Sequence, residues 1–178
     1  LSHSPEEATD ILVASADHRS VGTRRKIAEN LSRIHTQEAT LALTLADRLS
    51  SETDESIQIL CASFVGVLAR FSEEEFVLRA QSILTKGNQK ATQRLVESGL
   101  RDYLSTNSTD PAQLLSLAWL SSSEIGRSRV GNLIVEQARV SPEAFQTTCE
   151  TIKQANLESF ENLAKWVEMR SSDAYKLL

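Results

Sequence analysis

The apolar residues of this chain recur at the three- and four-residue steps of helices, and the longest apolar stretch lies between Gln58 and Arg70. Within that stretch every position except Ser63 is apolar or glycine. A helix that is apolar on all sides needs neighbours on more than one side, so we expect an inner helix of a larger array. No segment keeps strict apolar and polar alternation between hairpin turns. We therefore predict an all-α protein without a sheet.

Helix start signals divide the chain into ten predicted helices. Proline follows a capping residue at Ser4-Pro5, Asp110-Pro111 and Ser141-Pro142. Proline is tolerated at the first helical position because its missing N–H would have no partner there. Thr36 and Ser72 offer further caps. The predicted helices form antiparallel pairs over residues 5–35, 37–71, 73–105, 111–140 and 142–170, followed by a C-terminal tail over 171–178.

The predicted pairs repeat along the chain. Their second helices share an apolar triad at positions i, i+4 and i+7, which reads Ile27-Leu31-Ile34, Phe64-Leu68-Phe71 and Val96-Leu100-Tyr103. Helix pairs that recur at about 30 to 45 residues are typical of an α-solenoid, because one pair cannot bury its apolar face alone. We expect residues 1–178 to form a single helical-repeat domain, an α-solenoid of about five antiparallel helix pairs. The alternative is a compact, irregular multi-helix bundle.

One segment carries a resemblance to a known repeat family. Residues 23–34 read Thr-Arg-Arg-Lys-Ile-Ala-Glu-Asn-Leu-Ser-Arg-Ile, and a helix with leucine at every fourth position follows. The early basic residues Arg24 and Arg25, the Ile-Ala-x-x-Leu core and the short link resemble HEAT-type and armadillo-like repeats. The resemblance implies a right-handed superhelix, a curved rod whose second helices (the even-numbered ones in chain order) line the concave face and bind proteins. The tetratricopeptide pattern fits less well, because Trp119 and Trp166 stand in unrelated contexts.

Composition narrows the class of protein. Hydrophobic residues make up 40% of the chain and charged residues 24%, which is enough for a core. The formal net charge of −5 argues against a dedicated nucleic-acid module, which needs a basic surface. Cys61 and Cys149 lie in different predicted helices, so we interpret them as reduced, buried residues of a cytoplasmic protein. No apolar run reaches the ~18 residues needed to cross a bilayer. Because the chain starts at Leu1 rather than Met, we expect it to be a section of a larger protein.

Glycine positions indicate packing rather than chemistry. Residues 126–131 contain two glycines but lack the Lys-Ser/Thr pair of a phosphate loop, and no strand precedes them. Gly66 and Gly99 also lie inside predicted helices, where glycine costs ~1 kcal/mol relative to alanine. All of these glycines predict a close approach of a neighbouring helix. His18 and His35 flank one helix at a separation of roughly 25 Å, so they cannot share a metal ion. We predict no enzymatic activity, no cofactor and no metal site.

The basic residues suggest a partner. They gather on the second helices of the pairs, and the candidate partner-binding residues are Arg24, Arg25, Lys90, Arg94, Arg101, Arg127 and Arg129. If these helices face one way, an acidic protein carries a basic stripe that fits an acidic peptide. The alternative is ion pairing between repeats, for which the acidic partners are Glu29, Asp54, Glu97 and Asp102.

We therefore predict a non-enzymatic protein–protein interaction or scaffold module that binds a protein or an acidic peptide, without a membrane segment. One alternative is a nucleic-acid-binding module related in shape to the HEAT-like DNA glycosylases. It would need aromatic residues beside the arginines, and these are scarce there. Another is a structural segment that self-associates through an end repeat, because the end segments around Leu12 and Leu177 are partly apolar.

Overall fold

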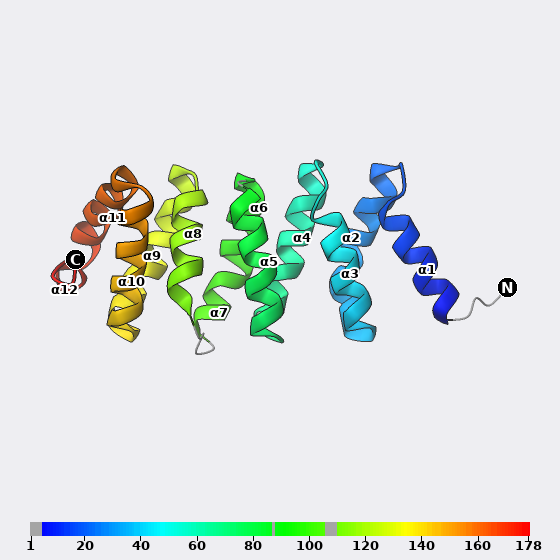
Figure 1. Ribbon diagram of the computed structural model, residues 1–178, viewed down its shortest axis with the longest axis horizontal. Coiled ribbons are helices and arrows are strands. Elements are labelled where there is room, and N and C mark those ends of the chain that lie inside the picture. Colours follow the sequence, from blue (N-terminus) through cyan, green and yellow to red (C-terminus); the bar gives the residue numbers. More distant parts are fainter. Residues whose placement is uncertain (1–4, 87, 106–109) are drawn as a thin grey trace.

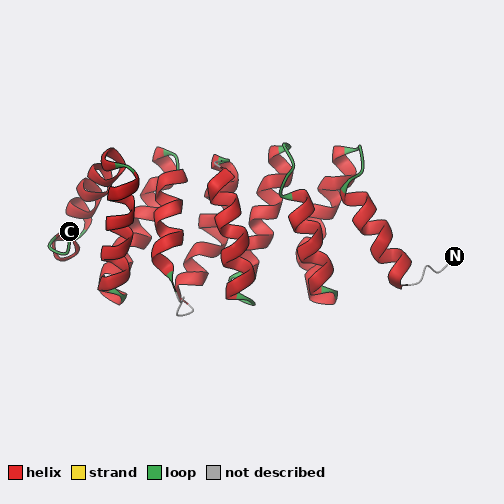
Figure 2. Cartoon of the chain, in the orientation of Figure 1, coloured by secondary structure: helices red, strands yellow, loops and turns green. Residues whose placement is uncertain are grey.

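The helices of the protein stand side by side in chain order. The structure, a computed structural model, describes residues 5–86, 88–105 and 110–178. Helices account for 86% of these residues and no strand occurs among them, which confirms the predicted all-α fold. The molecule is elongated, and its first and last helices lie at opposite ends of the long axis (Figure 1). Short loops join the helices at the two long edges of the row (Figure 2).

The helices fall into two layers, which we name by their place in each pair. The first-helix layer contains α1 (Pro5–Ala16), α3 (Ala39–Leu49), α5 (Glu73–Lys86), α8 (Pro111–Ser121) and α10 (Pro142–Ala155). The second-helix layer contains α2 (Val21–Gln37), α4 (Glu55–Leu68), the continuous run α6 (Gln89–Leu95), η1 (Val96–Leu100) and α7 (Arg101–Ser105), then α9 (Glu124–Val140) and α11 (Leu157–Arg170). A short α12 (Ser172–Tyr175) follows. Within layers α1 packs on α3, α5 on α8, α2 on α4, and α9 on α11.

Most predicted helix starts agree with the structure, and three details differ. Thr36 is not a cap, because α2 continues through it to Gln37 and its hydroxyl donates to the carbonyl of Arg33. Asp110 precedes Pro111 without a side-chain capping hydrogen bond. The second helix of the third pair contains a π-helical turn, η1, in place of uninterrupted α-helix. The predicted cap at Ser4 lies outside the described residues.

Polar caps set the spacing of the second helices. The residues at the N-caps of these helices are Ser20, Asp54, Asn88, Ser123 and Asn156. They recur at intervals of 33 to 35 residues. All except Ser20 accept a hydrogen bond from a backbone N–H of the first helical turn, which satisfies a donor that the helix leaves free. A polar residue therefore precedes the second helix of each pair.

The core runs between the two layers, and α4 is enclosed as predicted for an inner helix. It contacts α2, α3, α5, α6 and η1. Its residues Ile57, Phe64 and Leu68 are at most 2% exposed. The apolar triads of the second helices are buried with one exception, Phe71, which is 65% exposed. That prediction was wrong because α4 ends at Leu68, so Phe71 lies in the following turn and packs on the ring of His35.

Two glycine contacts bring second helices close together, as the sequence predicts. A Cβ atom on Gly99 would lie 2.5 Å from the Cα atom of Gly66. A Cβ atom on Gly131 would lie 2.6 Å from the indole of Trp166, in α11. Carbon atoms in contact normally stay about 3.5 to 4.0 Å apart. These positions therefore have no room for any side chain while the helices keep their spacing.

Candidate partner-binding surface

The seven predicted residues all lie in the second-helix layer, but they do not form one continuous group. Arg24 and Arg25 are in the first turns of α2, Lys90 and Arg94 are in α6, and Arg101 is in α7. The remaining two, Arg127 and Arg129, are near the start of α9. Each of them has a defined neighbour, and those neighbours divide the residues into structural contacts and surface contacts.

Arg24 holds two pairs together. Its guanidinium donates a hydrogen bond to Glu52 at 2.9 Å, lies 2.8 Å from the other carboxylate oxygen of Glu52 in an ion pair, and donates to the carbonyl of His18. The side chain is only 14% exposed. Arg25 is more exposed and pairs with Glu29 one turn along the same helix at 3.2 Å. A hydrogen bond from Lys26 lowers the pKa of Glu29. Arg24 therefore stabilises the contact between two helix pairs, whereas Arg25 forms an ion pair within one helix at the surface.

Lys90 and Arg94 connect α6 with α4. The Lys90 ammonium lies 2.6 Å from the carboxylate of Glu55, and Arg94 donates to the hydroxyl of Ser63 at 2.7 Å. Arg127 instead lies over the ring of Trp119, 5.7 Å from its centroid. Cations over an aromatic face are attracted by its negative potential. These three residues thus act mainly between neighbouring helices.

Arg101 and Arg129 come together at the third and fourth pairs. Arg129 of α9 pairs with Glu97 of η1, and Arg101 of α7 lies 3.5 Å from Glu136 of α9. The two ion pairs cross the same junction in opposite directions. Between them is a surface depression of about 270 Å³, whose other lining residues are Val96, Asn132 and Leu133. It combines two guanidinium groups, the carboxylate of Glu97 and an amide with an aliphatic floor.

The acidic residues that the sequence offers as alternative partners are only partly used in that way. Glu29 and Glu97 pair with Arg25 and Arg129. Asp102 pairs with Arg70 at 2.5 Å. Asp54 caps α4, and the hydrogen bond from the Ser56 hydroxyl lowers its pKa. A recurring sequence separation of 32 to 35 residues between a cation and an acid is the signal that predicts further pairs, such as Arg101 with Glu136.

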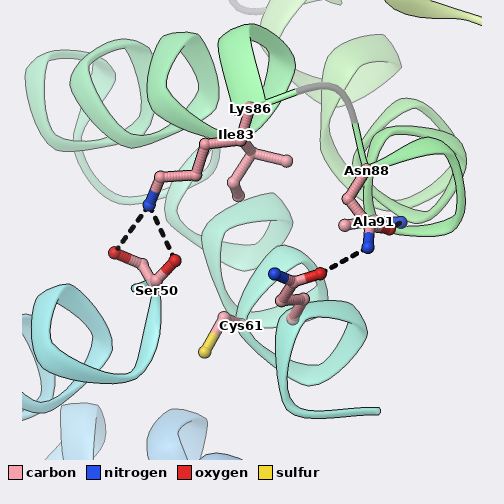
Figure 3. A pocket seen from close by; sticks show the side chains of 7 residues that line it. Ser50, Cys61, Ile83, Lys86, Asn88 and Ala91 are labelled. Carbon is pink, nitrogen blue, oxygen red and sulfur yellow. Dashed lines mark hydrogen bonds between the residues drawn. The ribbon is translucent and has the colours of Figure 1, made fainter. Parts of the chain in front are cut away.

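A pocket around Cys61 is too small to be a site for an organic ligand. It has a volume of about 20 Å³, which is room for one water molecule. Figure 3 shows the hydrogen bonds beside it: Lys86 donates to the carbonyl and to the hydroxyl of Ser50, and Asn88 donates to Gln58. Burial raises the pKa of the Cys61 thiol to about 12. A thiol with that pKa stays protonated at neutral pH and is a poor nucleophile.

Metal ligands, membrane-spanning helices and similarity to known proteins give no indication of a further site in the described part of the chain. In the described ranges, no three histidine, cysteine, aspartate or glutamate side chains are placed to hold a metal ion. None of the described helices combines the length and the apolar character needed to cross a membrane. Comparison of the chain with family models, with curated proteins and with solved structures finds no match.

Proposed function

We propose that the chain is an α-solenoid of the HEAT-like or armadillo-like type, with a right-handed superhelix, and that it acts as a non-enzymatic protein-binding scaffold. Repetition of the same kind of contact from pair to pair supports this. Side-chain hydrogen bonds join neighbouring pairs at separations such as 31 residues for Arg94 and Ser63, and 36 residues for Lys86 and Ser50. A row of pairs built in this way has a long surface, which suits an extended partner.

The second-helix layer offers the site for an acidic peptide, and the depression between η1 and α9 carries this proposal. Arg101 and Arg129 are 72% and 51% exposed in their side chains, so a ligand can reach both guanidinium groups. Guanidinium groups bind carboxylates with two parallel hydrogen bonds. The aliphatic floor of Val96 and Leu133 provides an apolar contact beside them. An acidic residue next to an apolar one fits this combination.

The ion pairs that occupy the two arginines do not prevent binding. Exposed ion pairs contribute about 0 to 1 kcal/mol each, because water already solvates both charges. An incoming carboxylate can therefore replace Glu97 or Glu136 at little cost, and the released carboxylate is solvated again. The arginines are held in place before binding, which reduces the conformational entropy lost when the partner arrives.

The test compares two charge-reversed variants that carry the same net charge. The first is R101E/R129E. The control is R33E/K165E, which reverses two exposed cations of the same layer away from the depression. Fluorescence polarisation with a labelled peptide of alternating glutamate and leucine measures the Kd of each. We expect R101E/R129E to weaken binding by about tenfold or more, since hydrogen bonds to charged groups are lost, and the control to bind like the wild type.

Two results would count against the proposal. Equal binding of the acidic peptide by R101E/R129E and the wild type would remove the depression as the site. Salt-dependent binding of duplex DNA that both variants weaken equally would favour the nucleic-acid alternative. Circular dichroism of every variant establishes that the helices have formed before any comparison is made.

A further inference from the structure

We propose that the first-helix layer is a second docking surface, which binds a basic amphipathic helix of a partner protein. This surface is separate from the proposed acidic-peptide site in the second-helix layer. The proposal is based on two open grooves between neighbouring first helices, on the aliphatic residues that line them, and on the charge of the layer as a whole.

The larger groove lies between α5 and α8 and has a volume of about 530 Å³. Val77 and Leu78 line it, and Leu78 is 62% exposed although it is a large aliphatic residue. Glu74 and Asp110 lie on its margin. Neither carboxylate forms an ion pair with any described residue. The groove thus presents an apolar floor between negative charges.

A second groove of the same character lies between α1 and α3. Its volume is about 500 Å³. Val13 and Leu41, both partly buried, line it, and Asp10 and Glu38 are its acidic residues. Two separate junctions of the layer therefore combine aliphatic and acidic side chains around an open volume of similar size.

The α3–α5 junction between these two grooves is joined by charged side chains. Arg79 of α5 lies 2.8 Å from Asp47 of α3 and also pairs with Glu75 of its own helix. The printed hydrogen bonds between α5 and α8 are neutral, because Gln81 donates to Gln113 and the Ser121 hydroxyl donates to the carbonyl of Leu84. Among the described residues, an ion pair therefore joins α3 and α5, whereas neutral groups join α5 and α8.

The negative charge of the first-helix layer favours a basic partner. The helices α1, α3, α5, α8 and α10 contain nine acidic and four basic residues, whereas the second helices contain nine acidic and twelve basic residues. Acidic residues in the first turn of a helix also stabilise it through the helix dipole, which accounts for part of the excess. The dipole does not account for the exposed Leu78 or for the open volume. Positive charges flanking an apolar stripe complement both.

A helix is the occupant that fits best, because the groove runs between two neighbouring helices of the layer. An amphipathic helix places apolar residues at i, i+3, i+4 and i+7 on one face, which can enter the groove. Lysine or arginine on either side of that face then meets Glu74 and Asp110. Opposite charges at the margin increase the association rate and fix the orientation of the bound helix.

The test uses a labelled helical peptide of lysine and leucine, with leucine on one face, and measures its Kd by fluorescence polarisation. The variant E74Q/D110N removes two carboxylates of the larger groove, and E150Q/E161Q removes two exposed carboxylates outside both grooves. We expect the first to weaken binding by about three- to tenfold, because each surface ion pair contributes up to about fivefold. The control should match the wild type.

A second variant separates the apolar contact from charge. L78A should weaken binding by about tenfold, since most of a leucine side chain loses its burial, and should leave the salt dependence of the Kd unchanged. R101E/R129E should not weaken binding of this basic peptide, so that failure of either proposed surface is recognised independently of the other.

Three results would overturn the proposal. The first is absence of binding to the wild-type protein, and the second is equal loss with E74Q/D110N and E150Q/E161Q, which indicates non-specific attraction to an acidic protein. The third is self-association: if sedimentation shows a concentration-dependent dimer of the wild type that L78A abolishes, the groove binds another copy of this chain.

Discussion

Replacement of Gly99 by alanine tests the close contact between η1 and α4. In an ordinary exposed helix this substitution stabilises, because alanine has the higher helix propensity by about 1 kcal/mol. Here the new Cβ atom would lie 2.5 Å from the Cα atom of Gly66, 3.0 Å from its carbonyl oxygen and 3.0 Å from the ring of Phe76. Two of these three atoms are backbone, so no side-chain rotation can make room.

The expected magnitude follows from the displacement. The helices η1 and α4 must separate by roughly 1 Å to restore a normal carbon–carbon contact. Overpacking of this kind typically costs about 1 to 3 kcal/mol, which exceeds the gain in helix propensity. We therefore expect G99A to lower the free energy of unfolding. At about 2 to 4 °C per kcal/mol for a chain of this size, the Tm should fall by several degrees.

Gly22 provides the matched control. It is exposed in the first turn of α2, and the nearest atom to an added Cβ is the hydroxyl oxygen of Ser20 at 3.5 Å, an ordinary contact. G22A should therefore be neutral or stabilising by up to about 1 kcal/mol. The two variants make the same chemical change, so opposite signs identify packing as the cause.

Urea unfolding followed by two probes measures the effect. Far-ultraviolet circular dichroism reports the whole helical array, whereas tryptophan fluorescence reports only the C-terminal pairs, because Trp119 and Trp166 lie in α8 and α11. A G99A protein as stable as the wild type, or more stable, would refute the packing argument. A loss seen by circular dichroism before the fluorescence changes would show that the pairs unfold separately.

Three further predictions concern the stability of the fold. R79M removes the cation that joins α5 to α3, and it should lower the free energy of unfolding by about 1 to 3 kcal/mol. The loss should be smaller than for a fully buried pair because the carboxylates are partly solvated. R48M removes the cation of an exposed ion pair, and it should lower the free energy of unfolding by less than about 1 kcal/mol in the same urea titration. Cys61 and Cys149 should resist alkylation in the native protein and react on unfolding, since burial raises the pKa of each thiol to about 12. The same shift predicts that the free energy of unfolding falls as the pH rises above the ordinary thiol pKa of about 8.5, because only the unfolded thiols ionise there. Asp54 has a lowered pKa, so its carboxylate cap stabilises the fold above the usual aspartate pKa, and this stabilisation is lost as the pH falls through the pKa in the folded state. The Tm difference between wild type and D54A should therefore disappear in acid. A Tm difference that stays constant with pH would contradict this prediction.

The candidate surface was only partly predictable from the chain. The basic residues of the second helices are evident from their positions, but their partners depend on distances between pairs. Arg24 and Arg129 both lie in the first two turns of a second helix, yet one is 14% exposed and bonded to Glu52, and the other is half exposed beside a depression. The grooves of the first-helix layer are formed by residues of two neighbouring helices, so no local pattern predicts them.

Local sequence patterns predict which segments are helices and where most of them begin. Capping residues such as Asn88 and Asn156 act on the turn that follows them, and apolar steps define the buried face of one helix. Both signals are local, so they can be recognised without coordinates. What each helix face contacts depends on the tertiary structure. Phe71 is exposed and Gly99 lies against Gly66, because these properties arise only when residues far apart in the chain come into contact.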